Sequence, residues 1–258
     1  MMDRTIVMIH GMFGGSWCWD NYRRFFTDRG CRCLAPALRH HEADPRDEPH
    51  PDLGTTSLLD YADDLEKVIR GLDEKPVVMG HSMGGLIAQI LGSRGLARLL
   101  VLLTPATPAG ILAIDPSVIK SAAVNVCEWG FWKKPIRSTY EATCYSAMHL
   151  LPEPERREAF SRFGYESGRA LFEMGFWFLD GRQATRIDAA AIAVPVLIVS
   201  GAEDRITPSS GHRKLARKYR KVASYMEFPN HAHWIFGEPG WETIAGHIHL
   251  WLSHNAGS

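Results

Sequence analysis

The sequence predicts an α/β protein in which helices flank one mostly parallel, doubly wound sheet of about six strands. Short apolar runs rich in β-branched residues alternate with segments of helical periodicity, which is the pattern of parallel strands joined by right-handed crossovers. One apolar run, 77–79, enters a G-x-S-x-G pentad and passes into a helix-forming sequence without a loop. Between residues 105 and 193 the alternation stops, which indicates an insertion.

Four of the expected strands lie before residue 105. Thr5–Ile9 is a continuous apolar run, as expected for a parallel strand that is buried on both faces. Residues 31–35 form a weaker strand, which Pro36 ends because proline has no N–H for the ladder. The runs at 77–80 and 99–103 are apolar as well.

Helical patterns separate these strands. Between Ser57 and Gly71 apolar residues recur at helical spacing, with Ser57 placed to cap the helix and Gly71 to end it. Two more helices are expected, one from about 17 to 29 and one from the pentad to about Gly92.

Strand–helix order resumes after residue 193. Strands are expected at 196–200 and 222–228, and helices at about 209–219 and 238–253. Residues 105–193 have the pattern of helices without a strand. They hold twelve of the chain's aromatic residues, which are 8 Trp, 7 Tyr and 11 Phe. We therefore predict a core of residues 1–104 and 194–258. Residues 105–193 are predicted as a helical cap over the carboxyl ends of the strands, where such sheets bind ligands.

Composition restricts the class of partner and the compartment. The chain has 29 basic and 29 acidic residues, so no net field favours nucleic acid or an anionic membrane. Five cysteines, an odd number without C-x-x-C pairs, suit a reducing compartment and give no zinc spacing. No apolar stretch is long enough for a membrane helix, and the first residues do not read as a signal peptide. We expect a soluble cytoplasmic protein with no metal and no cofactor.

The pentad places Ser82 at a sharp turn between strand and helix. Such a turn needs an unusual backbone angle at its apex and tolerates only glycine nearby, which Gly80 and Gly84 supply. The hydroxyl of Ser82 then lies beside free backbone N–H groups at the positive end of a helix dipole. This is the setting of a nucleophile.

A serine hydroxyl needs a base to take its proton, and the base needs a third group to orient it. The loop after strand 196–200 contains Glu203 and Asp204, and the loop after strand 222–228 contains His231 and His233. A nucleophile, an acid and a base therefore follow in chain order, one at each of three strand ends.

These motifs resemble those of the α/β-hydrolase fold family over essentially the whole chain. The matching segments are His10-Gly11-x-x-Gly14-Gly15, Gly80-His81-Ser82-Met83-Gly84, Gly201-x-x-Asp204 with Pro208, and Ala232-His233-Trp234 ahead of Glu238-Pro239. The resemblance implies Ser82 as nucleophile, Asp204 as orienting acid and His233 as general base. It also implies an oxyanion hole formed by the backbone N–H groups of Met12 and Met83. The family's sheet begins with an antiparallel hairpin, and only four residues precede Thr5 here. If the rest of the family's strand order is kept, the resemblance implies that strand 31–35 is an edge, where Arg32 would discourage pairing with another chain.

Each of the three catalytic roles has a rival. Ser82 could be an ordinary tight-turn serine, but the strand before it and the helix after it favour a nucleophile. Glu203 could act as the acid, but it stands one residue early in the Gly-x-x-Asp spacing. His231 could act as the base, but the five-residue step from His233 to Glu238 and the small Ala232 favour His233.

Other reactive residue types are better explained without chemistry. His10 and His81 are interpreted as shaping their loops, and Cys18 as a packed neutral thiol. The histidines and carboxylates of residues 40–52 have no ligand spacing on a rigid element, so a solvated loop is favoured over a metal site.

The leading hypothesis is a cofactor-independent carboxylic ester hydrolase, of the carboxylesterase or lipase type, that acts on a small-molecule ester with an apolar acyl or aromatic group. A second hypothesis is a lyase or a cofactor-free haloperoxidase or perhydrolase on the same fold, for which Lys133 and Lys134 are the nearest charged candidates in the cap. A third is a ligand-binding protein that retains the pocket. The sequence does not decide between a monomer and a homodimer.

Overall fold

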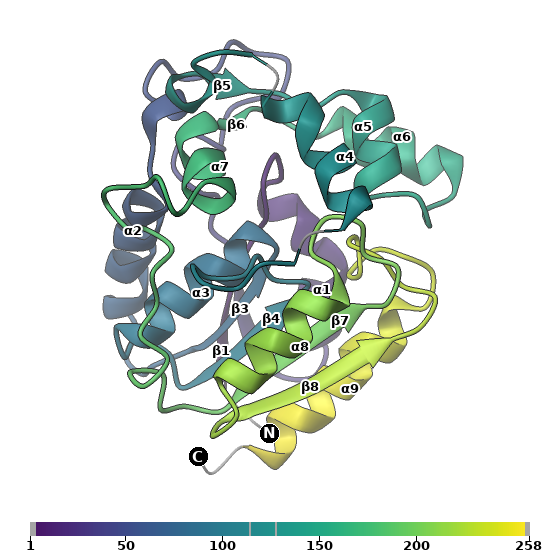
Figure 1. Cartoon of the computed structure of the whole chain (residues 1–258). Helices are drawn as coiled ribbons and strands as arrows, with labels where there is room; N and C mark the ends of the chain where they lie inside the picture. Colours follow the sequence, from purple (N-terminus) through teal and green to yellow (C-terminus); the bar gives the residue numbers. More distant parts are fainter. Residues whose placement is uncertain (1–3, 114, 127, 256–258) are drawn as a thin grey trace.

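The computed structural model describes residues 4–113, 115–126 and 128–255. In these residues it contains a six-stranded sheet in the order β2-β1-β3-β4-β7-β8, with every neighbouring pair parallel (Figure 1). Its strands are β1 Arg4–Ile9, β2 Cys31–Leu34, β3 Val77–His81, β4 Leu99–Leu103, β7 Val196–Gly201 and β8 Ala223–Phe228. The predicted α/β class and sheet are therefore confirmed, and β2 is an edge strand as expected.

Helices cover both faces of the sheet, because successive side chains of a strand point to opposite sides. On one face Val7, Val78 and Leu100 pack against α2 (Leu58–Arg70), α3 (Met83–Ser93) and α8 (Ser209–Lys218). On the other face the alternate strand residues pack against α1 (Asp20–Thr27) and α9 (Trp241–His254). Burial on both sides explains why the strand sequences are apolar throughout.

The helix ends follow the predicted capping chemistry. Ser57 caps α2: its hydroxyl accepts from the N–H of Leu59, and the carboxylate of Asp60 accepts from the N–H of Ser57. Gly71 follows the last turn. The expected helix at 17–29 is shorter than predicted, with a 3₁₀ turn, η1 Ser16–Trp19, leading into α1.

Residues 105–193, which we call the insert, connect β4 to β7. The insert contains α4 Pro116–Val126, α5 Tyr140–Ser146, α6 Glu153–Ser161, α7 Gly168–Gly175 and the 3₁₀ turn η3 Phe131–Lys133. The expectation that it has no strand is wrong. Two-residue strands β5 (Pro135–Ile136) and β6 (Glu166–Ser167) pair in antiparallel register beside another 3₁₀ turn, η2 Leu53–Thr55. These strands are too short to give a periodic signal.

The insert lies at the end of the sheet where the strands lead into the catalytic loops predicted from the sequence (Figure 1). Val118 on α4, Leu171 on α7 and Trp177 line a cavity together with Ser82. None of the helices in the described ranges has the length and apolarity that crossing a membrane requires.

Candidate active site

Ser82 stands between β3 and α3 at φ 52° and ψ −119°, a conformation that side-chain-bearing residues rarely adopt. Neighbouring backbone holds it there. The N–H of Ser82 donates to the carbonyl of Leu103 on β4, and its carbonyl accepts from the N–H groups of Gly85 and Ala106. A Cβ at Gly80 would collide with the carbonyl of Gly84, which explains the glycine before the turn.

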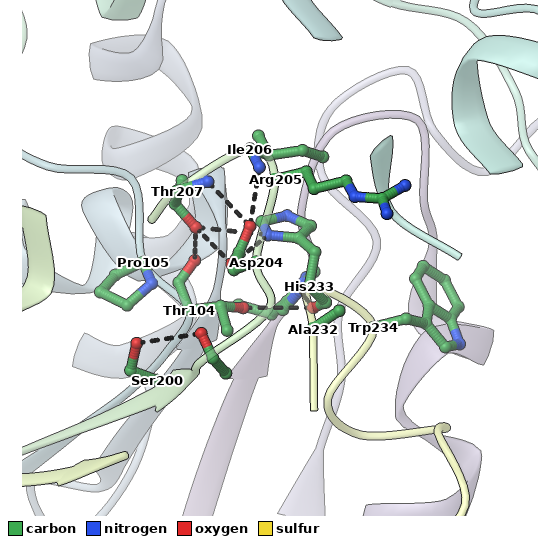
Figure 2. Close-up of polar contacts among 12 residues, drawn as sticks. Thr104, Pro105, Ser200, Asp204, Arg205, Ile206, Thr207, Ala232, His233 and Trp234 are labelled. Carbon is green, nitrogen blue, oxygen red and sulfur yellow. Dashed lines mark hydrogen bonds and ion pairs between the residues drawn. The ribbon is translucent and has the colours of Figure 1, made fainter. Parts of the chain in front are cut away.

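Asp204 and His233 are joined directly, at the ends of β7 and β8. Nδ1 of His233 donates to Oδ2 of Asp204 at 2.8 Å, and both side chains are buried (Figure 2). The other oxygen, Oδ1, accepts from the N–H groups of Ile206 at 2.8 Å and Thr207 at 2.9 Å. Burial raises the pKa of Asp204, but the charge and hydrogen bond of His233 and the Thr207 N–H outweigh it. The net pKa is lowered, so the carboxylate is ionised at neutral pH.

The sequence did not reveal how two threonines support this pair. The hydroxyl of Thr207 donates to Oδ2 of Asp204 at 2.8 Å and also lies 3.0 Å from the carbonyl of Thr104 (Figure 2). The hydroxyl of Thr104 donates to the carbonyl of His233 at 3.2 Å. Thr104 directly follows β4, so its place at a strand end was the signal that could have identified it.

The contacts of His81 explain why a histidine stands in the pentad. Its Nε2 donates to the carbonyl of His233 at 2.8 Å, and its ring packs edge-on against Phe236. Complete burial holds the pKa of His81 well below its usual value, so the ring is neutral. It therefore has the loop-shaping position that was expected.

The two rivals from the sequence lie elsewhere. The side chain of Glu203 is exposed, and Asp204, not Glu203, contacts His233. His231 instead lies 3.2 Å from the buried carboxylate of Glu238. That carboxylate also accepts from the N–H groups of Ala232 at 2.8 Å and Trp234 at 3.1 Å, the residues on either side of His233. Glu238 therefore fixes the backbone on both sides of His233. The five-residue step from His233 to Glu238 was the sequence signal for this contact.

The glycine-rich loop after β1 runs against the serine turn. A Cβ at Gly11 would lie 3.0 Å from the Cβ of Ser82, so this loop needs glycine to approach so closely. Met12 follows, and it lines two cavities together with Ser82. Within the described chain, the N–H groups of Met12 and Met83 donate to no other residue. Both N–H groups therefore remain available as donors.

His10 and Cys18 have structural surroundings in the same loop region. Nε2 of His10 accepts from the N–H of Leu38 at 3.1 Å, and burial lowers the pKa of His10 to about 4. Burial raises the pKa of the Cys18 thiol to about 12, so it is a neutral packed group. Neither residue is placed to react.

Ser82 opens into two adjoining cavities. One, of about 150 Å³, is also lined by His233, Trp234 and Phe163. The other, of about 300 Å³, is lined mainly by apolar side chains of the insert, among them Leu112, Met174 and Trp177. Ser82 and His233 thus share one cavity, although no hydrogen bond joins them in the described chain. Such contacts are often loose until substrate binds.

The described residues contain no cluster of three or more His, Cys, Asp or Glu side chains that could hold a metal ion. Lys133 and Lys134 line neither of the two cavities that Ser82 lines. Lys134 forms an ion pair with Glu128, and Lys133 lines a separate cavity with Trp132 and Arg169.

The fold, the strand-end loops and the serine turn define a class of protein. The alpha/beta hydrolase family matches this chain over residues 6–242. The chain belongs to this family.

Relatives in the family differ in what they do. The chain is 34% identical to methylesterase 8 of Arabidopsis thaliana, but over 35% of this chain and 32% of the relative. It is 24% identical to a non-heme chloroperoxidase of Kitasatospora aureofaciens over 92% of this chain and 87% of that one. The first of these matches therefore spans about a third of the relative's length.

Solved structures share the fold over nearly the full chain. A pyrethroid hydrolase of Sphingobium faniae superposes with a TM-score of 0.75 at 19% identity, covering 99% of both chains. A methylesterase of Arabidopsis superposes with a TM-score of 0.73 at 14% identity, covering 97% of this chain and 99% of that one. At these identities the likeness concerns the fold alone.

Proposed function

We propose that this protein is a serine hydrolase that cleaves a carboxylic ester through a Ser82–His233–Asp204 triad. The observation that supports it most strongly is the 2.8 Å hydrogen bond between Asp204 and His233, whose ring lines the same cavity as Ser82. Family membership and the esterases among the relatives agree with this assignment.

The proposed reaction begins with attack of the Ser82 hydroxyl oxygen on the ester carbonyl. Nε2 of His233 takes the proton, while Asp204 holds the Nδ1 proton and stabilises the imidazolium. The N–H groups of Met12 and Met83 bind the oxyanion, and each such donor contributes roughly 2.7–4 kcal/mol to the transition state. His233 then protonates the leaving alcohol, and water repeats the sequence on the acyl enzyme.

The two cavities suggest how the substrate is divided. The leaving oxygen must lie next to His233, so the alcohol is assigned to the cavity of about 150 Å³ that His233 lines. The acyl group then occupies the cavity of about 300 Å³ beside Leu112, Met174 and Trp177. We therefore propose an apolar acyl group, of small to medium size, esterified to a smaller alcohol.

Labelling with a fluorophosphonate tests the proposed chemistry. We expect the folded protein to be labelled at Ser82 and the Ser82→Ala variant to remain unlabelled. A panel of p-nitrophenyl esters of increasing acyl length, run on both proteins, then measures the size of the acyl cavity. Failure of the intact, folded protein both to label and to hydrolyse any ester of the panel would disprove the proposal.

The chloroperoxidase relative supports a second candidate, because the match covers 92% of this chain. The same triad would let hydrogen peroxide replace water as the nucleophile on the acyl enzyme, which gives a peracid. Peracid formation from acetate and hydrogen peroxide that exceeds ester hydrolysis would favour this candidate. Ligand binding without any turnover would favour a binding protein instead.

A further inference from the structure

Glu166 is a buried carboxylate of the insert that contacts the glycine-rich loop near Ser82. It lies on β6 and is fully buried. Its Oε1 accepts from the hydroxyl of Tyr61 at 2.8 Å and the N–H of Ser167 at 2.7 Å. Its Oε2 lies 3.2 Å from Nε2 of His41 and accepts from the N–H of Phe13 at 3.4 Å.

Phe13 is the residue after Met12, and both of its backbone polar groups are held by the insert. Its N–H donates to Glu166, and its carbonyl accepts from the N–H of Gly164 at 3.0 Å. Phe13 has φ 63°, in the left-handed region that a non-glycine residue rarely occupies. Such a conformation persists only where the surroundings enforce it. The two contacts to the insert provide that enforcement.

The charge state of the cluster favours this contact. Burial raises the pKa of Glu166, but the charge of His41 and the hydrogen bonds from His41, Ser167 and Tyr61 outweigh it, so the pKa is lowered. Burial lowers the pKa of His41, and the charge of Glu166 reverses this and raises it. The lowered pKa of Glu166 favours its ionised form, and the raised pKa of His41 favours an imidazolium beside it. An ionised carboxylate accepts a hydrogen bond from a backbone N–H more strongly than a neutral carboxyl group does.

We infer that Glu166 is a positioning residue that keeps Met12, and with it the Met12 N–H, in place beside Ser82 by anchoring the peptide between Met12 and Phe13. This inference rests on the proposed function. With the Phe13 N–H held by Glu166, the Met12–Phe13 peptide cannot flip, because a flip would turn the Met12 carbonyl toward the carboxylate. The chain is thereby anchored directly after Met12, so the Met12 Cα and the preceding peptide, which carries the Met12 N–H, cannot move away from Ser82. The insert therefore helps to build the oxyanion hole besides covering the substrate.

Glu173 provides a matched control within the same insert. It is also a fully buried carboxylate, and it also ties the insert to the core. It accepts from the hydroxyl of Ser57 at 2.8 Å, from the N–H of Leu58 at 2.8 Å and from Nε of Arg169 at 2.8 Å. None of these partners belongs to the glycine-rich loop.

The test compares Glu166→Ala, Glu166→Gln and Glu173→Ala in the full chain with p-nitrophenyl butyrate, per folded molecule. We expect Glu166→Ala to lower kcat at least about tenfold with little change in KM, short of the 10²–10³-fold loss that follows removal of an oxyanion donor. The rate of fluorophosphonate labelling should fall in parallel, because the phosphoryl oxygen occupies the same hole. Glutamine keeps one oxygen acceptor, so Glu166→Gln should recover part of kcat. Glu173→Ala should lower thermal stability and leave kcat near the wild-type value.

Several outcomes would overturn the inference. Equal loss of kcat in Glu166→Ala and Glu173→Ala would show that any loosening of the insert has this effect. Unchanged kcat and labelling in both Glu166 variants would show that the Met12 N–H does not depend on the carboxylate. If Glu166→Ala does not fold, the isosteric Glu166→Gln decides in the same way. A wild-type protein that neither labels nor hydrolyses esters would instead refute the proposed function, and the inference with it.

Discussion

The strained backbone of Ser82 predicts an unusual response to glycine. At φ 52° and ψ −119°, a residue with a Cβ is held in a sparsely populated region, which costs about 1–3 kcal/mol. Glycine adopts these angles freely because they mirror an ordinary extended conformation. Replacing alanine by glycine at this position should therefore relieve strain. The comparison of Ser82→Gly with Ser82→Ala isolates that relief, because both variants lack the hydroxyl.

Two opposing effects reduce the expected gain. Glycine gives the unfolded chain additional freedom, which costs about 0.4–1 kcal/mol. Loss of the buried Cβ costs about 0.8 kcal/mol. The net difference therefore lies between about 0.8 kcal/mol against glycine, for the smallest strain, and about 2 kcal/mol in its favour, for the largest. For a chain of 258 residues the larger gain corresponds to roughly 4–8 °C in Tm.

Thermal unfolding of the two variants, followed by calorimetry, measures the difference. Ala216→Gly is the control, because Ala216 lies inside the regular helix α8. There glycine should lower stability by about 1 kcal/mol. The strain argument fails if glycine at position 82 is less stable than alanine by as much as it is in α8.

Three further predictions concern the remaining parts of the site. Asp204→Asn should lower kcat by about 10⁴-fold, as expected when the base loses its correct tautomer. Because folding lowers the pKa of Asp204 below 3.8, the ionised carboxylate should stabilise the wild type above pH 3.8, and urea unfolding should show this stabilisation being lost as the pH falls below that value. Burial raises the pKa of Glu238 from 4.5 to about 7, so the stability of the wild type relative to Glu238→Gln should fall by about 3 kcal/mol as pH rises from about 4.5 through 7; a pH-independent difference would contradict this. Met174→Trp should fill the larger cavity and lower kcat/KM more for p-nitrophenyl octanoate than for the acetate; an equal loss for both esters would argue against an acyl group there.

The sequence allowed prediction of the sheet because its strands are buried on both faces. The predicted strands agree with the observed ones to within one or two residues at each end, and β2 is an edge of the sheet in the described residues, as predicted. The serine turn was equally visible, since only glycine fits where Gly80 and Gly84 meet neighbouring backbone. Short-range sterics determine such features, so a local pattern carries them.

The polar contacts between distant segments could not be predicted in this way. Glu166 is 153 residues from Phe13 in the chain, and Thr104 is 129 residues from His233. No local spacing indicates that these groups meet. The strands β5 and β6 were missed for a related reason, because two residues cannot show an alternating pattern. The roles assigned to Ser82 and its partners stay predictions until the labelling experiment is done.

Two loops of the candidate site share one physical problem. A loop at a strand end leaves its backbone N–H groups outside the sheet ladder, and burial beneath an insert would leave them unpaired at a cost of about 1–3 kcal/mol each. Glu238 accepts the N–H groups on either side of His233, and Glu166 accepts the N–H that follows Met12. Each carboxylate satisfies buried donors and at the same time fixes the direction of the neighbouring residue. Substitutions in the insert that suit a new substrate are therefore constrained, because Glu166 on β6 also makes the contact to Phe13 that shapes the proposed oxyanion hole.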